Sequence, residues 1–229
     1  MSALAEPNLR REIKMLAGAH ALSEVRAWIR ANPAGFRRLH PPRQINNAYL
    51  DTPHLESLEE NLAGIAVKRK LRLRWYGTSA RAARVVVQIK GKLGSSGWKV
   101  EHHVDQPIDL AGASWSAIRS SIRPGLAGQI RSEFDRRTLP VFINHYQREY
   151  FVSGDRRVRL TLDTAQVVYD QRHSGIVNLT RPAATLPYAI VELKADAGDA
   201  RLAQVSATLP LRFEAVSKYV MAAEAVLGR

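Results

Sequence analysis

Alternation between apolar and polar residues recurs along most of the chain and is its main structural signal. In residues 68–76, Leu71 and Leu73 alternate with Lys70 and Arg72. Such alternation places successive side chains on opposite faces of a β-strand. The pattern predicts strands at about residues 10–16, 44–51, 68–76, 84–91, 98–104, 141–152, 156–163, 165–170 and 188–194.

Helical patterns lie between these strands, and turn-forming residues separate several of them. Ser153-Gly154-Asp155 stands between two long strands and predicts a hairpin. Residues 114–136 fit two short helices divided at Pro124-Gly125. Further helices are predicted at residues 21–31, 55–62 and 213–227. Together these elements predict an α+β fold with a mostly antiparallel sheet and helices packed outside it.

The polar faces of the predicted strands are rich in Arg and Lys, and a carboxylate recurs one or two steps away. The residues on these faces are Glu12, Lys14, Asn47, Tyr49, Asp51, Lys70, Arg72, Arg74, Gln88, Lys90, Lys99, Glu101, Asn144, Tyr146, Arg148, Tyr150, Arg159, Thr161, Asp163, Glu192 and Lys194. Any single strand also fits a sheet with one face in water. Taken together, the strands favour a closed antiparallel β-barrel of about eight strands, polar inside and apolar outside, because closure removes the exposed edges.

Composition sets limits on the kind of protein. The 229 residues, 45% of them hydrophobic and 24% charged, fit a single domain over residues 1–229. The absence of cysteine excludes disulfides and thiolate metal ligands, and suits a cytoplasmic location. Neither a signal peptide nor a transmembrane segment is predicted, so any role at a membrane would need a separate membrane partner.

A net charge of +13 favours anionic partners such as nucleic acid, acidic membranes or phosphate-rich small molecules. The predicted helices carry no basic stripe, so nucleic acid is the least favoured partner. Cations crowded inside a barrel need a polyanion to compensate them. Arg and Lys bind phosphate oxygens, and carboxylates bind divalent cations that bridge to phosphate. The predicted interior therefore suits metal-dependent phosphoryl transfer.

Short motifs along the chain, taken in their order, resemble those of a known family. The motifs, which span nearly the whole chain, are Arg10-Arg11-Glu12-Ile13-Lys14, Tyr49-Leu50-Asp51-Thr52, Lys70-Leu71-Arg72-Leu73-Arg74-Trp75-Tyr76, Ile89-Lys90-Gly91-Lys92, Tyr146-Gln147-Arg148, Val158-Arg159-Leu160-Thr161-Leu162-Asp163, Val191-Glu192-Leu193-Lys194 and Ser217-Lys218-Tyr219. In this order they resemble the polyphosphate-polymerase domain of the vacuolar transporter chaperone (VTC) family, in the triphosphate tunnel metalloenzyme superfamily.

The resemblance implies roles for particular residues. The implied partners are ATP and polyphosphate, the cofactor is Mn²⁺ or Mg²⁺, and the γ-phosphoryl of ATP is moved onto a phosphate or polyphosphate acceptor. The implied catalytic residues are Lys14, Arg72, Arg74, Lys90, Arg148, Arg159 and Lys218. The implied phosphate-binding residues are these seven together with Lys70, Lys99 and Lys194. The implied metal ligands are Glu192 as the main one, with Glu12 and Asp163.

Two positions bear on which reaction is expected. The first-strand motif Arg10-x-Glu12-x-Lys14 fits the polymerase branch better than the Glu-x-Glu-x-Lys of the hydrolytic branch. Gln88 stands where a Glu often precedes the fourth-strand lysine, and an amide is a poorer metal ligand than a carboxylate. A tunnel-type triphosphatase and a non-catalytic polyphosphate-binding module therefore remain alternatives. Tyr146 and Tyr150, on the polar face, are candidates to contact phosphate or a nucleobase.

Overall fold

One antiparallel sheet organises the chain, in a computed structural model that describes residues 10–93, 96–211 and 217–228. Its strands follow the order β1-β9-β7-β6-β2-β3-β4-β5, and β8 pairs with β7 beside this path. The strands are β1 (Arg10–Gly18), β2 (Arg37–Asp51), β3 (Val67–Tyr76), β4 (Val86–Leu93), β5 (Ser96–His103), β6 (Leu139–Val152), β7 (Arg159–Asp170), β8 (Ala184–Leu186) and β9 (Tyr188–Asp196). The predicted α+β fold with a large antiparallel sheet is confirmed.

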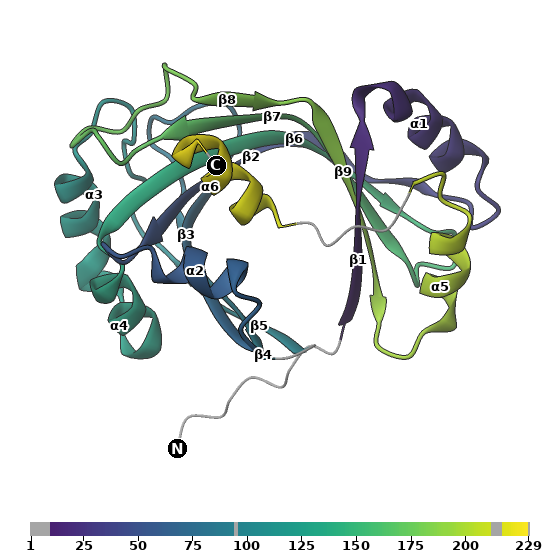
Figure 1. The fold of residues 1–229 in the computed structure, drawn as a ribbon, viewed down its shortest axis with the longest axis horizontal. Coiled ribbons are helices and arrows are strands. Elements are labelled where there is room, and N and C mark those ends of the chain that lie inside the picture. Colours follow the sequence, from purple (N-terminus) through teal and green to yellow (C-terminus); the bar gives the residue numbers. More distant parts are fainter. Residues whose placement is uncertain (1–9, 94–95, 212–216, 229) are drawn as a thin grey trace.

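The sheet curves strongly, so that one of its faces is concave (Figure 1). The described residues give no backbone pairing between β1 and β5, the two ends of the path. A side-chain contact does join the two sides of the sheet. Lys90 Nζ on β4, the neighbour of the end strand β5, lies 3.8 Å from Glu12 Oε2 on β1. Closure of the sheet into a barrel therefore stays a prediction.

Most of the apolar side of the sheet, which is its convex side, is covered by helices (Figure 1). The helical segments are η1 (Ala19–Ala21), α1 (Leu22–Ala31), α2 (Glu56–Leu62), α3 (Trp115–Ile122), η2 (Arg123–Gly125), α4 (Gly128–Arg136), α5 (Ala200–Ala207) and α6 (Lys218–Leu227). Helices α1 and α5 pack on the apolar faces of β1, β7 and β9. Helices α3 and α4 pack on those of β3 and β4. The apolar sides of the alternating strands are thus buried under helices, as the sequence predicts.

Helix α6 departs from the prediction that the helices pack outside. It lies against the concave face, where the Tyr219 ring is 5.1 Å from that of Tyr49 and 5.5 Å from that of Phe142. Leu58 of α2 joins the same buried cluster. The aromatic residues here give the concave face an apolar patch at one end, and α6 covers it. The predicted start of this helix at residue 213 lies outside the described residues, and Ser217 caps Lys218–Leu227.

Other differences follow from local sequence. Strand β2 begins at Arg37 rather than near residue 44, and the prolines at 41 and 42 concealed the extension. They are accommodated where the β2–β6 register shifts between His40 and Arg43. The two predicted strands 156–163 and 165–170 form one strand, β7, which carries Ala165 at a positive φ of 50°. The short elements β8 and α5 were not predicted.

Among the described residues, no helix is both long enough and apolar enough to cross a membrane.

Candidate active site on the concave face of the sheet

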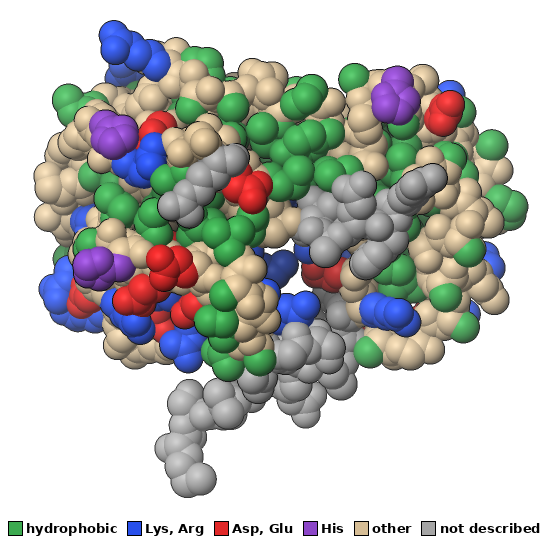
Figure 2. Space-filling model, in the orientation of Figure 1, with side chains coloured by type: hydrophobic (Ala, Val, Ile, Leu, Met, Phe, Trp, Pro, Cys, Tyr) green, Lys and Arg blue, Asp and Glu red, His purple; other side chains and the backbone are tan. Residues whose placement is uncertain are grey.

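Charged and polar side chains gather on the concave face, nearly all on the strand positions opposite the buried apolar ones and one at the start of α6. We call this set the charged concave face. Its members are Glu12, Lys14, Lys70, Arg72, Arg74, Gln88, Lys90, Lys99, Glu101, Arg148, Arg159, Asp163, Glu192, Lys194 and Lys218. Figure 2 shows a hollow near the middle of the molecule in which basic and acidic side chains are visible.

Glu192, on β9, is the most enclosed carboxylate on the β1–β9 side. It is 4% exposed, and its Oε1 lies 3.3 Å from Lys14 Nζ and 3.5 Å from Lys194 Nζ. Arg148 Nη2 is 4.0 Å from the other oxygen. Burial alone would raise the pKa of Glu192, but the surrounding cations hold it well below its usual value. Glu192 is therefore ionised at neutral pH.

Glu12, on the neighbouring strand β1, shares two of these lysines. Its carboxylate lies 2.9 Å from Lys194 Nζ and 3.2 Å from Lys14 Nζ. Burial and the Glu192 charge would raise the pKa of Glu12, but three surrounding lysines hold it below its usual value. Burial would lower the pKa of Lys14, but the two carboxylates raise it. The result is a compact network of two carboxylates bridged by two lysines.

Asp163, on β7, is tied to cations from two other elements. It is fully buried and accepts two hydrogen bonds from the Arg148 guanidinium, of 2.6 and 2.7 Å. Lys218 Nζ, at the start of α6, is 2.7 Å from Asp163 Oδ2. Burial would raise the pKa of Asp163, but Lys218 and Arg148 lower it. Asp163 thus fixes α6 to the sheet and orients two predicted phosphate-binding cations.

The wall made by β3, β4 and β5 carries a chain of polar contacts. Arg72 Nε donates to Gln88 Oε1 at 2.8 Å, and the Gln88 amide nitrogen donates to Glu101. Glu101 in turn pairs with Lys99 at 2.8 Å. Arg72 also reaches the Tyr49 hydroxyl at 3.2 Å. Gln88 is therefore held between a cation and a carboxylate, and Glu101 is a carboxylate on this wall that the predicted ligand set left out.

Arg74 and Lys70, also on β3, have no carboxylate partner within ion-pair distance among the described residues. Arg74 Nε donates to Asn47 Oδ1 at 2.8 Å, and Asn47 donates to Asn144. Lys70 Nζ donates to Ser217 Oγ at 3.0 Å. These neutral contacts orient both side chains without compensating their charge.

Lys70 and Lys90 show the electrostatic cost of this crowding. Burial, followed by the charges of neighbouring cations, lowers the pKa of Lys70 to about 7. The same causes lower the pKa of Lys90 to about 8, although its side chain remains 44% exposed. The cations that act on Lys70 come from three strands, and they are Lys90, Lys14, Lys68 and Arg72. Ten cations and four carboxylates make up the charged concave face, so it carries an excess of positive charge.

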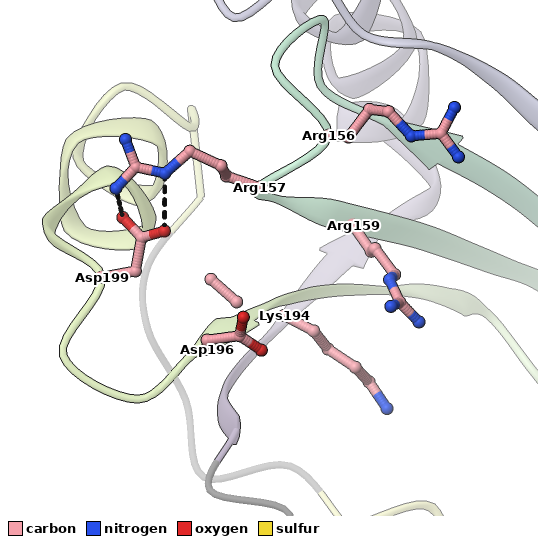
Figure 3. A pocket seen from close by; sticks show the side chains of 7 residues that line it. Arg156, Arg157, Arg159, Lys194, Asp196 and Asp199 are labelled. Carbon is pink, nitrogen blue, oxygen red and sulfur yellow. Dashed lines mark hydrogen bonds and ion pairs between the residues drawn. The ribbon is translucent and has the colours of Figure 1, made fainter.

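Arg159 and Lys194 lie beside a cavity of about 230 Å³ at one end of the face. Figure 3 shows their side chains extending in the same direction, away from the Arg157–Asp199 pair. Arg157 donates to both Asp199 oxygens, at 2.9 and 2.7 Å. Arg159 makes no ion pair with any residue that the structure describes. Of the predicted set, Arg159 and Lys194 are thus the two that line this cavity.

The carboxylates of this face differ in how well they suit Mn²⁺ or Mg²⁺. Within the described ranges, no three carboxylate or imidazole side chains form a group that could hold an ion by themselves. Mg²⁺ is usually bound by one or two carboxylates together with substrate phosphates. Glu12 and Glu192 fit that mode, with the other ligands supplied by a bound phosphate chain. Asp163 has both oxygens engaged by cations and is less available.

Asp51 belongs to the structure rather than to the site. It is fully buried, and its oxygens accept hydrogen bonds from the backbone amides of Thr52, Ser57 and Leu58. The Tyr219 hydroxyl donates to it at 2.8 Å. The sequence grouped Asp51 with the polar interior, but it joins the start of α2 to α6 instead. Alternation alone could not reveal that its oxygens accept from the backbone amides at the start of α2.

The fold resembles that of solved structures with low sequence identity to this chain. The candidate adenylyl cyclase of Hippeastrum, for which a dominant triphosphatase activity is described, has a similar structure, with a TM-score of 0.50 and 17% identity over 95% of each chain. A candidate adenylate cyclase of Vibrio parahaemolyticus has a TM-score of 0.49 and 14% identity, over 98% of this chain and 100% of that one.

The family is shown by the sequence itself. Residues 9–227 match the family model described as the VTC domain. The chain belongs to the VTC domain family, which confirms the resemblance that its ordered motifs suggested. No curated protein matches the sequence.

Proposed function

We propose that this chain is a metal-dependent phosphotransferase that extends a polyphosphate chain with the γ-phosphoryl group of ATP. The observation that carries the proposal is the excess of cations on the charged concave face. Burial and repulsion lower the pKa of Lys70 to about 7 and that of Lys90 to about 8. A bound polyanion would relieve both penalties.

The cations of this face suit a chain of phosphates better than a single phosphate. Arg72 and Arg74 project from one strand, and Arg148 and Lys218 converge from another strand and a helix. Guanidinium groups contact phosphate oxygens in pairs, whereas lysines act as compact charges. A triphosphate laid across these groups would be held at several points. Such positioning is the main task of the protein in phosphoryl transfer.

The carboxylates would supply the metal site. Glu12 and Glu192 would hold Mn²⁺ or Mg²⁺ together with oxygens of the bound triphosphate. A divalent cation there would neutralise charge that develops on the transferring phosphoryl group. Lys14 and Lys194 contact both carboxylates and would keep them ionised and oriented. Arg148, held by Asp163, would contact the phosphate oxygens.

In the proposed reaction, an oxygen of the acceptor phosphate forms a bond to the γ-phosphorus of ATP. The bond between that phosphorus and the β–γ bridging oxygen breaks, and ADP leaves with the electron pair. The Arg10-x-Glu12-x-Lys14 motif, which resembles that of the polymerase branch, supports a phosphate acceptor over water. We expect the curved sheet to close around the chain through contacts such as Glu12–Lys90.

The test is incubation of the pure protein with ATP and Mn²⁺, followed by separation of polyphosphate from free phosphate. We expect long-chain polyphosphate from the wild type and none from Glu192→Gln. The variant should still bind tripolyphosphate without metal, because it removes a negative charge from a basic site. Glu24→Gln, on the outer helix α1, is the matched control and should retain activity.

Each other outcome has a defined meaning. Free phosphate alone would show a triphosphatase, and retained polyphosphate without turnover would show a binding module. Unchanged turnover in Glu192→Gln would overturn the assignment of the metal site.

A further inference from the structure

An Arg–Tyr cluster lies at the edge of the concave face, and the proposed reaction does not use it. The Arg43 guanidinium lies 4.2 Å from the centre of the Tyr76 ring and 5.2 Å from that of Tyr150. Arg43 Nε donates to the Tyr150 hydroxyl at 2.9 Å, and His40 meets the Tyr150 ring edge-on at 5.6 Å. We call these four residues the rim cluster.

Strand register places the rim cluster directly beyond the charged residues. Arg43 of β2 is paired with Arg148 of β6. Tyr76 of β3 follows Arg74 by two residues and therefore faces the same side of the sheet. The aromatic patch under α6 lies in the other direction along the sheet, because its Tyr49 pairs with Arg72, two residues before Arg74. The charged concave face thus has α6 at one end and the rim cluster at the other.

The rim cluster presents flat surfaces to solvent. Tyr76 is 42% exposed, which is unusual for a large ring in this protein. Arg43 is exposed too, and within the described part of the chain it makes no ion pair with a carboxylate. Aromatic rings and guanidinium planes are the groups on which nucleobases stack. A phosphate would instead favour a cluster of cations, which the rim cluster is not.

We propose that the rim cluster is a stacking platform for the base of a nucleoside triphosphate whose phosphates occupy the charged concave face. This inference rests on the proposed function, because it needs a triphosphate bound on that face. Tyr76 and Arg43 provide the stacking surface, and Tyr150 holds Arg43 in place through its hydroxyl. Stacking of this kind tolerates any base, so the platform would favour nucleotides over inorganic triphosphate without selecting one base.

The test compares two ligands that differ in the presence of a nucleoside. ATP and tripolyphosphate are titrated calorimetrically into the wild type and into Tyr76→Ala and Arg43→Ala. We expect each variant to weaken ATP binding by about fivefold or more, which is the lower end of the range for loss of one stacking contact. Binding of tripolyphosphate should change less than about twofold, and it also reports that each variant is folded. Tyr76→Phe keeps the ring and should bind ATP like the wild type.

The failure of this inference differs from that of the proposed function. If the affinities for ATP and for tripolyphosphate fall equally in both variants, the rim cluster binds phosphate and the proposed platform is wrong. If neither affinity falls, the rim cluster has no part in binding and the proposed platform is again wrong. A wild type that binds neither ligand would overturn both proposals.

Discussion

The lowered pKa of Lys70 gives a quantitative test of the charged concave face. With a pKa of about 7, Lys70 holds a proton in roughly one molecule in ten at pH 8. A polyanion bound beside it would favour the charged form and restore the proton. Binding should therefore take up about 0.9 proton at this residue at pH 8, but only about 0.1 at pH 6.

Replacement of Lys70 by Arg isolates this effect. Arginine keeps its proton at all working pH values, so residue 70 then contributes no proton uptake. Lys90 and the ligand also exchange protons, but they do so in both proteins. The wild type should thus take up about 0.9 proton more than Lys70→Arg at pH 8, and nearly the same number at pH 6.

The number of protons can be measured by calorimetry with tripolyphosphate and no metal. The binding enthalpy is determined in two buffers with different enthalpies of ionisation, and the slope gives the protons exchanged. Equal uptake by the two proteins at pH 8 would refute the reasoning, because Lys70 would then be fully charged before any ligand binds.

The same pKa predicts the direction of a stability change. The folded pKa of Lys70 lies below its ordinary value of 10.5, so the unfolded chain holds more protons at this residue between about pH 7 and pH 10.5. The free energy of unfolding should therefore gain a contribution that rises with pH across that window. Lys70→Met should reduce this slope in urea titrations at several pH values.

Two further predictions concern packing. Asp51→Ala removes the acceptor of three backbone amides and of the Tyr219 hydroxyl, and should lower the free energy of unfolding by about 3 kcal/mol or more. Tyr219→Phe removes only one of these bonds and should cost about 1 kcal/mol in the same urea titration. Gly91→Ala would drive a methyl group into the Trp98 indole and should cost about 1–3 kcal/mol. Trp98→Ala should remove that collision. The double variant should therefore lose less stability than the two single variants lose together, and a loss equal to that sum would contradict the proposed packing of Gly91 against Trp98.

The alternating strands were predictable because their signal is local. Side chains in a strand face opposite sides with a period of two, so the sequence alone separates Lys70, Arg72 and Arg74 from the leucines between them. The opposite faces of Glu192 and Val191 follow from the same rule. Every predicted strand has a counterpart in the sheet, and the outer faces pack under helices as expected.

The position of α6 was not predictable from its own pattern. Its sequence shows a helix, but periodicity does not say which side of a sheet the helix covers. Only the packed structure shows that Tyr219 meets Tyr49 and Phe142, which brings Lys218 to Asp163 and Ser217 to Lys70. Contacts between residues so far apart along the chain depend on the register and curvature of the whole sheet.

Which side chains share a face could be read from the sequence alone, because it depends only on the geometry of each strand. Which of these side chains meet depended on the packing of the whole chain. This packing made Asp51 a structural anchor, placed Arg43 beside Tyr76, and bridged Glu12 to Glu192 through lysines. The physical reason is that strand order, register shifts and helix placement are fixed by burial of apolar surface across the whole molecule, which no local pattern records.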